Sequence, residues 1–172
     1  MPTQFYPFRT STTLTAFLMV LSASFTRQLV EFTTSCIGKD GFKIIVGFIF
    51  ITSATVFGTA EAKRLASPLR IPAMLALLAI VLFYSWQIKL PAVRMHIIMY
   101  AVVGWLATRD ATKPGRTWKM ILVAWLFAAL AGTFEELLQI LLPYRIFDFN
   151  DIIYNIKGAT VGVVLYLIRP KS

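Results

Sequence analysis

A cluster of polar side chains interrupts an otherwise apolar chain between residues 135 and 162. The segment reads EELLQILLPYRIFDFNDIIYNIKGATVG. Its carboxylates, guanidinium and carboxamides belong to Glu136, Gln139, Arg145, Asp148, Asp151 and Asn155. The forked donors of an arginine suit a phosphate or a carboxylate, and carboxylates accept hydrogen bonds from hydroxyl groups or amines. The residue types therefore predict a ligand-binding site.

The spacing of these residues indicates two helix faces. Glu136 and Gln139 are three residues apart, so they share one face of a helix. On the following predicted helix, spacings of four, three and four place Asp151, Asn155, Gly158 and Gly162 on one face. The polar residues lie near the start of this helix, and the glycines lie further along it. The two glycines permit close approach of another membrane helix. Because isolated charges in a bilayer are costly, we expect the polar groups to pair with one another or to line a wet cavity.

A second polar block, RMHIIMY, adds donors from another helix. His96 and Tyr100 are one turn apart there, and Arg94 comes just before them. Glu136 is the best candidate for a general base, because a carboxylate inside an apolar helix is disfavoured without a role or a partner. The chain has no nucleophile motif of the Gly-x-Ser-x-Gly kind. Whether the protein is an enzyme is therefore left open.

Plainer interpretations of the same residues also stay open. Arg145 and Asp148 fit a solvated joint between helices, and His96 alone fits a hydrogen-bonded interface residue. Tyr100 fits packing or an interface anchor. Lys157 lies off the polar stripe, so it either pairs with an acidic residue of another helix or lines a cavity.

The composition is that of a membrane protein. Of the 172 residues, 58% are hydrophobic and 15% are charged, against roughly 25% charged residues in soluble domains. The net charge of +9 comes from short clusters of Lys and Arg between apolar runs, which indicates topology and anionic lipid rather than nucleic acid. Cys36 and His96 are each the only residue of their type. We therefore expect no disulfide within the chain, no metal site and no cofactor.

Apolar runs predict six helices, separated by short polar or Pro- and Gly-containing joints. They cover residues 12–35, 42–60, 71–88, 92–108, 118–142 and 150–168. A helix needs about 20 apolar residues to cross a bilayer. The predicted fold is thus an all-α polytopic transmembrane bundle with about six spans.

The Lys and Arg residues near the helix ends predict the orientation, because they concentrate on the cytoplasmic side. One side collects ten of them: Arg9, Lys63, Arg64, Arg70, Arg109, Lys113, Arg116, Lys119, Arg169 and Lys171. The other collects six: Arg27, Lys39, Lys43, Lys89, Arg94 and Arg145. Both termini are therefore predicted to be cytoplasmic, and the polar cluster is predicted to face outward.

These motifs resemble the signature of VanZ-like membrane proteins. That signature has a Glu-x-x-Gln pair, a Pro-x-Arg, an Asp, an Asp-x-x-x-Asn and a Gly-x-x-x-Gly, here at Glu136, Gln139, Pro143, Arg145, Asp148, Asp151, Asn155, Gly158 and Gly162. The block with His96 and Tyr100 is similar to the family's Lys-x-x-His-x-x-x-Tyr, with Arg94 as a looser match. The resemblance covers roughly residues 70–168. It divides the chain into two N-terminal helices without a family match (1–69) and a VanZ-like core (70–172).

The family is named for a teicoplanin resistance protein, so the resemblance implies a multi-pass protein of the bacterial inner membrane. We expect an outward-facing site that binds, and in one interpretation modifies, a lipid-linked envelope intermediate or a glycopeptide-type antibiotic. The alternative is an accessory subunit of a larger membrane complex, in which Arg145, Glu136 and Asp151 form an internal brace of ion pairs. The expected partners are the lipid bilayer and one of these ligands or other subunits.

Overall fold

The fold is described from a computed structural model, which covers residues 8–62, 70–87, 91–112, 117–145 and 147–168. Some side chains within the helices, including that of Arg94, lie outside the described part. The helices are α1 (Thr10–Ala62), α2 (Arg70–Gln87), α3 (Pro91–Ala111), α4 (Trp118–Ile140) and α5 (Phe149–Ile168). The described residues form no strand, so the predicted all-α class is confirmed.

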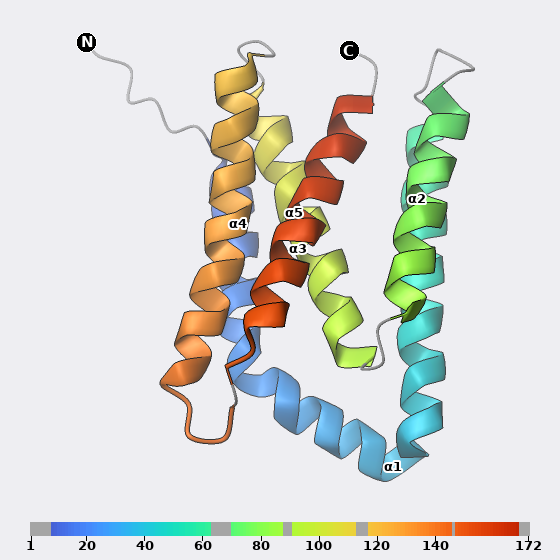
Figure 1. Cartoon of the computed structure of the whole chain (residues 1–172), viewed down its shortest axis with the longest axis vertical. Helices are drawn as coiled ribbons and strands as arrows, with labels where there is room; N and C mark the ends of the chain where they lie inside the picture. Colours follow the sequence, from blue (N-terminus) through green and yellow to red (C-terminus); the bar gives the residue numbers. More distant parts are fainter. Residues whose placement is uncertain (1–7, 63–69, 88–90, 113–116, 146, 169–172) are drawn as a thin grey trace.

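The first two predicted helices are joined into α1, which changes direction inside its length. Gly38 has a φ of 76° and a ψ of 167°, outside the helical region. Glycine tolerates this positive φ because it has no Cβ. In Figure 1, α1 begins behind α4, crosses beneath the other helices and then turns upward beside α2. The remaining four helices begin and end within three residues of the predicted positions.

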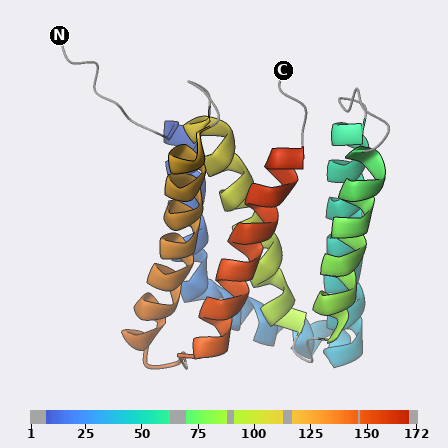
Figure 2. The same cartoon turned by 45° about the horizontal axis from the view of Figure 1, so that its top comes forward.

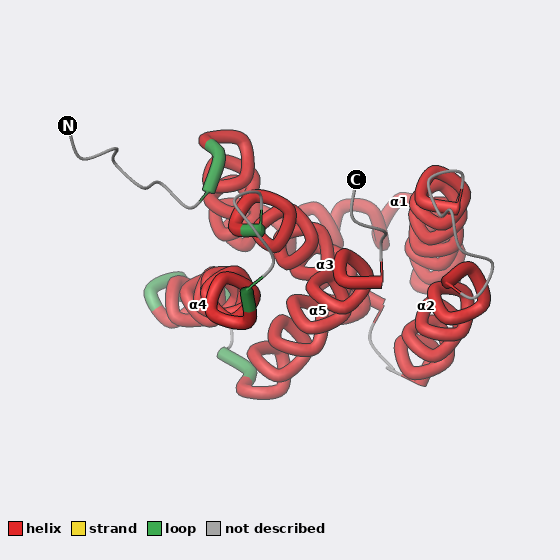
Figure 3. Tube along the Cα trace, turned by 90° about the horizontal axis from the view of Figure 1, so that it is seen from above, coloured by secondary structure: helices red, strands yellow, loops and turns green. Residues whose placement is uncertain are grey.

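The centre of the structure is the contact between α3, α4 and α5, which small residues bring close together. A Cβ added to Gly104 of α3 would lie 2.5 Å from the carbonyl oxygen of Ala159. One added to Gly158 of α5 would lie 2.6 Å from the carbonyl oxygen of Ile97. Backbones that approach this closely are typical of helix packing in membranes. Seen from above, α2 and the last part of α1 form a separate pair beside these three helices (Figure 3).

The start of α1, the start of α4 and the end of α5 lie at one end of the molecule (Figures 1 and 2). The α4–α5 joint and the start of α3 lie at the opposite end. Among the described helices, α4 and α5 are long and apolar enough to cross a membrane by length and composition. The structure therefore supports membrane helices in this chain, whereas a count of about six spans stays a prediction.

Asp110, which the sequence did not single out, fastens the start of α1 to the end of α3. Its carboxylate accepts hydrogen bonds from the Thr12 hydroxyl at 2.5 Å and from the backbone N–H of Arg9 at 3.0 Å. The Arg109 guanidinium donates to its other oxygen at 3.0 Å. A buried carboxylate at a helix N-terminus is stabilised by the unpaired N–H groups of the first turn.

We expect Asp110→Ala to lower the free energy of unfolding by about 2–3 kcal/mol, because it leaves the buried Thr12 hydroxyl and the Arg9 N–H without their acceptor. Thermal unfolding of the detergent-purified protein checks this. Asp40→Ala is the control, since Asp40 is exposed and its one ion pair among the described residues is with Lys43 at 2.8 Å. Equal unfolding temperatures for the two variants would contradict the role given to Asp110.

Candidate functional site

The polar residues meet where α3, α4 and α5 converge near the α4–α5 joint. His96 and Tyr100 come from α3, and Asn155 comes from α5. Glu136 and Gln139 come from α4. All five are buried, and Tyr100, Glu136 and Asn155 are 0% exposed. The structure thus brings together the two blocks of polar residues that the sequence shows about 40 positions apart.

Asn155 joins the three helices through its carboxamide. Its Nδ2 donates to the carbonyl oxygen of Gly132 at 3.0 Å, and its Oδ1 lies 2.9 Å from Nδ1 of His96. Because a carboxamide oxygen only accepts, Nδ1 of His96 must carry the hydrogen in this contact. A neutral imidazole then has its lone pair on Nε2. Gly132 makes room for this arrangement, since a Cβ there would lie 2.5 Å from Cβ of Asn155.

Glu135 is the partner of Tyr100. The Tyr100 hydroxyl donates to Oε2 of Glu135 at 2.7 Å, and Nδ1 of His96 lies 3.7 Å from the same oxygen. On this satisfied side of the cluster, the Tyr100 hydroxyl, Oε2 of Glu135 and the carboxamide of Asn155 all have hydrogen-bond partners. This satisfied side ties α3, α4 and α5 to one another, as a brace does.

Glu136 begins a different chain of contacts, which is incomplete. Gln139 donates from Nε2 to Oε1 of Glu136 at 3.0 Å, and Nε of Arg145 donates to Oε1 of Gln139 at 3.2 Å. Within the described residues, Oε2 of Glu136 is buried without a hydrogen-bond partner. Buried polar atoms are nearly always paired, so such an atom calls for an explanation.

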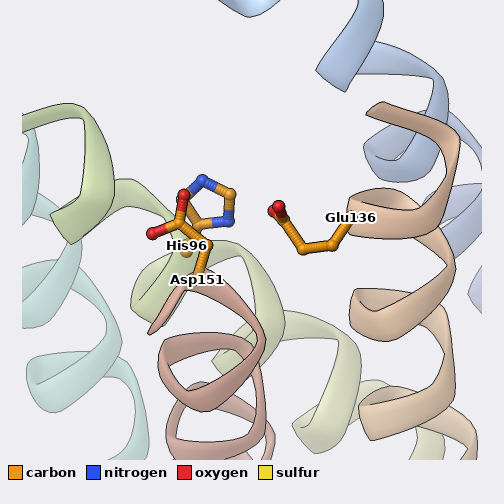
Figure 4. Close-up of side chains that lie close together, drawn as sticks. All are labelled: His96, Glu136 and Asp151. Atoms are coloured by element: carbon orange, nitrogen blue, oxygen red, sulfur yellow. The ribbon is translucent and has the colours of Figure 1, made fainter. Parts of the chain in front are cut away.

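Asp151 has the same property. Its Oδ1 is buried and has no hydrogen-bond partner in the described part of the chain. Figure 4 shows the Asp151 and Glu136 side chains reaching from different helices toward His96. One donor atom from each of the three residues lies within 4.8 Å of the other two. The two side chains that carry the unpartnered oxygens thus lie close to each other and to His96.

The brace of ion pairs that belongs to the alternative, accessory-subunit interpretation does not form in the described structure. Among the described residues, no nitrogen of Arg145 lies within 4.0 Å of a carboxylate oxygen of Glu136 or Asp151. The guanidinium contacts Gln139 instead. The bracing contacts come from His96, Tyr100, Glu135 and Asn155, as described above.

The side chains of Asp148 and Lys157 make their contacts outside this cluster. Asp148 is exposed, and its Oδ1 accepts from the backbone N–H of Asn150 at 2.8 Å, which caps the start of α5. Lys157 is exposed, with Nζ 5.4 Å from the ring centre of Tyr154. Arg94 lies in the first turn of α3, but its side chain is outside the described residues.

Sequence reasoning missed Glu135 and Gly132 as members of the site. A signal for both is present in the buried face of α4, which consists of Ala124, Ala128, Ala129, Gly132, Glu135, Glu136 and Gln139. Small residues recur at spacings of four along this face and lead directly to the two glutamates. Both glutamates therefore continue the packed face of the helix, because a helix face is wide enough to hold adjacent positions.

Comparison with known proteins places this arrangement in a family. The profile of the VanZ/LLP1 family matches residues 4–169, which include α1 and α2 as well as the polar cluster. Neither the curated proteins nor the solved structures gave a match. Because the match spans nearly the whole chain, it extends the resemblance of the polar motifs to the two N-terminal helices. The chain belongs to the VanZ/LLP1 family.

Proposed function

We propose that the protein is a multi-pass protein of the bacterial inner membrane whose polar cluster binds a phosphate-bearing component of the cell envelope, such as a lipid-linked sugar intermediate. The observation that carries the proposal is the pair of buried oxygens, on Glu136 and Asp151, that no described residue satisfies. Burying them without partners is unfavourable. A ligand with hydroxyl or amine groups would supply the missing donors.

Arg145 is the group that would hold the phosphate. It is half-buried at the α4–α5 joint, and the one hydrogen bond recorded for its guanidinium in the described structure uses Nε. The remaining N–H groups of the fork suit phosphate or carboxylate oxygens. Glu136 would be the general base if the ligand is also modified.

Binding to membrane nanodiscs tests this assignment. The probes are a polyisoprenyl pyrophosphate carrying an amino sugar, the matching polyisoprenol, and a teicoplanin-type glycopeptide. We expect the pyrophosphate lipid to bind at least about tenfold more tightly than the alcohol, and Arg145→Gln to remove that difference. Lys43→Gln, an exposed change in α1, should keep it. Equal binding of both lipids by folded protein would contradict the proposal, and binding of the glycopeptide alone would replace the lipid as the ligand.

The orientation of the site has a separate test by cysteine labelling. In a background with Cys36→Ser, Phe147→Cys introduces an exposed thiol into the α4–α5 joint, and Lys119→Cys introduces one at the opposite end. A membrane-impermeant maleimide added to intact cells should label position 147, and position 119 only after permeabilisation. The reverse pattern would place the cluster on the cytoplasmic side.

An accessory subunit is the second candidate, favoured by the satisfied contacts of Tyr100, Glu135 and Asn155. In that case the cluster serves only to brace the helices, and partner subunits cover exposed apolar residues such as Trp118. Stable co-purification of another membrane protein, together with no binding of either probe, would support this candidate.

A further inference from the structure

The three residues His96, Glu136 and Asp151 have the composition and arrangement of a cation site. Each comes from a different helix, and one donor atom of each lies within 4.8 Å of the others. We propose that they bind a divalent transition-metal cation, with Mn²⁺ and Zn²⁺ as the best-fitting ions. The proposal builds on the proposed function, because it places the cation among residues of the same site.

The unpartnered atoms are the first argument. Within the described structure, Oε2 of Glu136 and Oδ1 of Asp151 are buried and have no hydrogen-bond partner. Glu136 is 0% exposed, so bulk water does not reach it directly. Two carboxylates and an imidazole that lie this close together, with one buried oxygen of each carboxylate left unpaired, have the composition of a metal site.

The hydrogen bond of His96 is the second, independent argument. Histidines that bind metals usually donate their other ring N–H to a carbonyl or carboxylate oxygen, which fixes the ring and its tautomer. His96 has this contact, from Nδ1 to Oδ1 of Asn155 at 2.9 Å. Asn155 is itself held by Gly132 at 3.0 Å. The lone pair of Nε2 is then available to a cation.

Charge and ligand type select the class of ion. Two carboxylates in a buried site repel each other, and the nearby guanidinium of Arg145 is bonded to Gln139 rather than to either of them. A divalent cation would neutralise both carboxylates at once. One imidazole with two carboxylates suits Mn²⁺ or Zn²⁺, whereas Mg²⁺ and Ca²⁺ prefer oxygen alone. The single histidine of the chain led us to expect no metal site, but one histidine is sufficient when two carboxylates complete the set.

The spacing of the donors is close to what a cation requires. Ligand atoms at about 2.1 Å from a common ion lie roughly 3–4 Å from one another. The donors lie within 4.8 Å here, so small rotations of the side chains complete the site. Coordination positions that the protein leaves open would accept water or a phosphate oxygen of the proposed ligand, beside the Arg145 guanidinium.

Metal binding to the full-length protein in detergent tests the proposal. After treatment with a chelator and its removal, Mn²⁺ is titrated and followed by electron paramagnetic resonance, and bound Zn²⁺ is measured by elemental analysis. We expect one ion per chain for at least one of the two metals. Asp151→Asn and Glu136→Gln, which preserve side-chain size, should each weaken binding at least tenfold, about the lower end of what supporting residues of metal sites contribute. Asp40→Asn is the matched control, because Asp40 is exposed in α1, and it should bind like the unaltered protein.

Two results would overturn the proposal: no stoichiometric binding of either ion by folded protein, or equal binding by all variants. Lipid binding measured in the presence of chelator separates this outcome from the proposed function. If Arg145-dependent binding of the pyrophosphate lipid persists while neither metal binds, the cation site is wrong and the proposed function stands. If the metal binds but the lipid does not, the cation site stands and the proposed function is wrong.

Discussion

Tyr100→Phe should lower the free energy of unfolding by about 1–3 kcal/mol. Glu136→Gln, which changes another residue of the same polar cluster, should not lower the free energy of unfolding. The tyrosine hydroxyl donates to Glu135 at 2.7 Å in a fully buried position. Its removal leaves a buried carboxylate oxygen without that donor. Glu136 already has an unpartnered oxygen in the described structure, and a neutral amide is easier to bury than a carboxylate. Thermal unfolding in detergent measures both variants.

Glu135→Gln is the control for these two variants. It keeps a side-chain oxygen that accepts the hydrogen bond of Tyr100, and it is the same carboxylate-to-carboxamide change as Glu136→Gln, made at the neighbouring residue. We expect it to retain most of the stability. If Glu136→Gln destabilises the protein as much as Tyr100→Phe does, Glu136 is part of the brace and the division of the cluster into a satisfied and an unsatisfied side is wrong.

Gly162→Val should prevent stable folding or lower the free energy of unfolding by about 3 kcal/mol or more, the upper range for overpacking a core. A Cβ at position 162 would overlap the carbonyl oxygen of Ala101 and lie 2.7 Å from the backbone nitrogen of Trp105. Those atoms belong to the backbone of α3, so no side-chain rotation relieves the overlap. The yield of monodisperse protein and its unfolding temperature measure the effect.

The matched control is Gly47→Val in the second part of α1, where an added Cβ meets nothing within 4 Å. There the change should be tolerated, and Gly47→Ala should raise stability, because alanine is favoured over glycine in a helix by about 1 kcal/mol. If valine lowers the free energy of unfolding equally at positions 47 and 162, the contact between α3 and α5 is not the reason that glycine is required at position 162.

The helix positions could be predicted from the sequence because apolar runs and their Pro- and Gly-containing joints are local signals. The path of α1 could not, since the turn at Gly38 depends on one backbone conformation, with φ at 76°. A periodic pattern gives the face of a helix but not the direction of the helix that follows. The count of spans stays a prediction because, among the described helices, α4 and α5 are the ones long and apolar enough to cross a membrane.

The residues of the polar cluster could also be predicted from local sequence patterns, but their hydrogen-bond partners could not. Spacing placed Glu136 and Gln139 on one face, and they are hydrogen-bonded at 3.0 Å. The partner of Tyr100 is Glu135, which depends on how α3 crosses α4 rather than on any spacing within one helix. Likewise, Arg145 contacts Gln139 instead of a carboxylate. The α4–α5 joint folds back at this point, so Arg145 lies beside the last turn of α4.

The central claim is that Glu136 and Asp151 serve a ligand and not only the fold. Its most direct test is the binding of the amino-sugar pyrophosphate lipid by Glu136→Gln, Asp151→Asn and the control Glu135→Gln, each at an equal amount of folded protein. We predict at least about tenfold weaker binding for the first two variants, with folded yields equal to that of the unaltered protein, and near-normal binding for the control. Unchanged binding in the first two variants, or a loss of binding that matches a loss of folded protein, would contradict the claim.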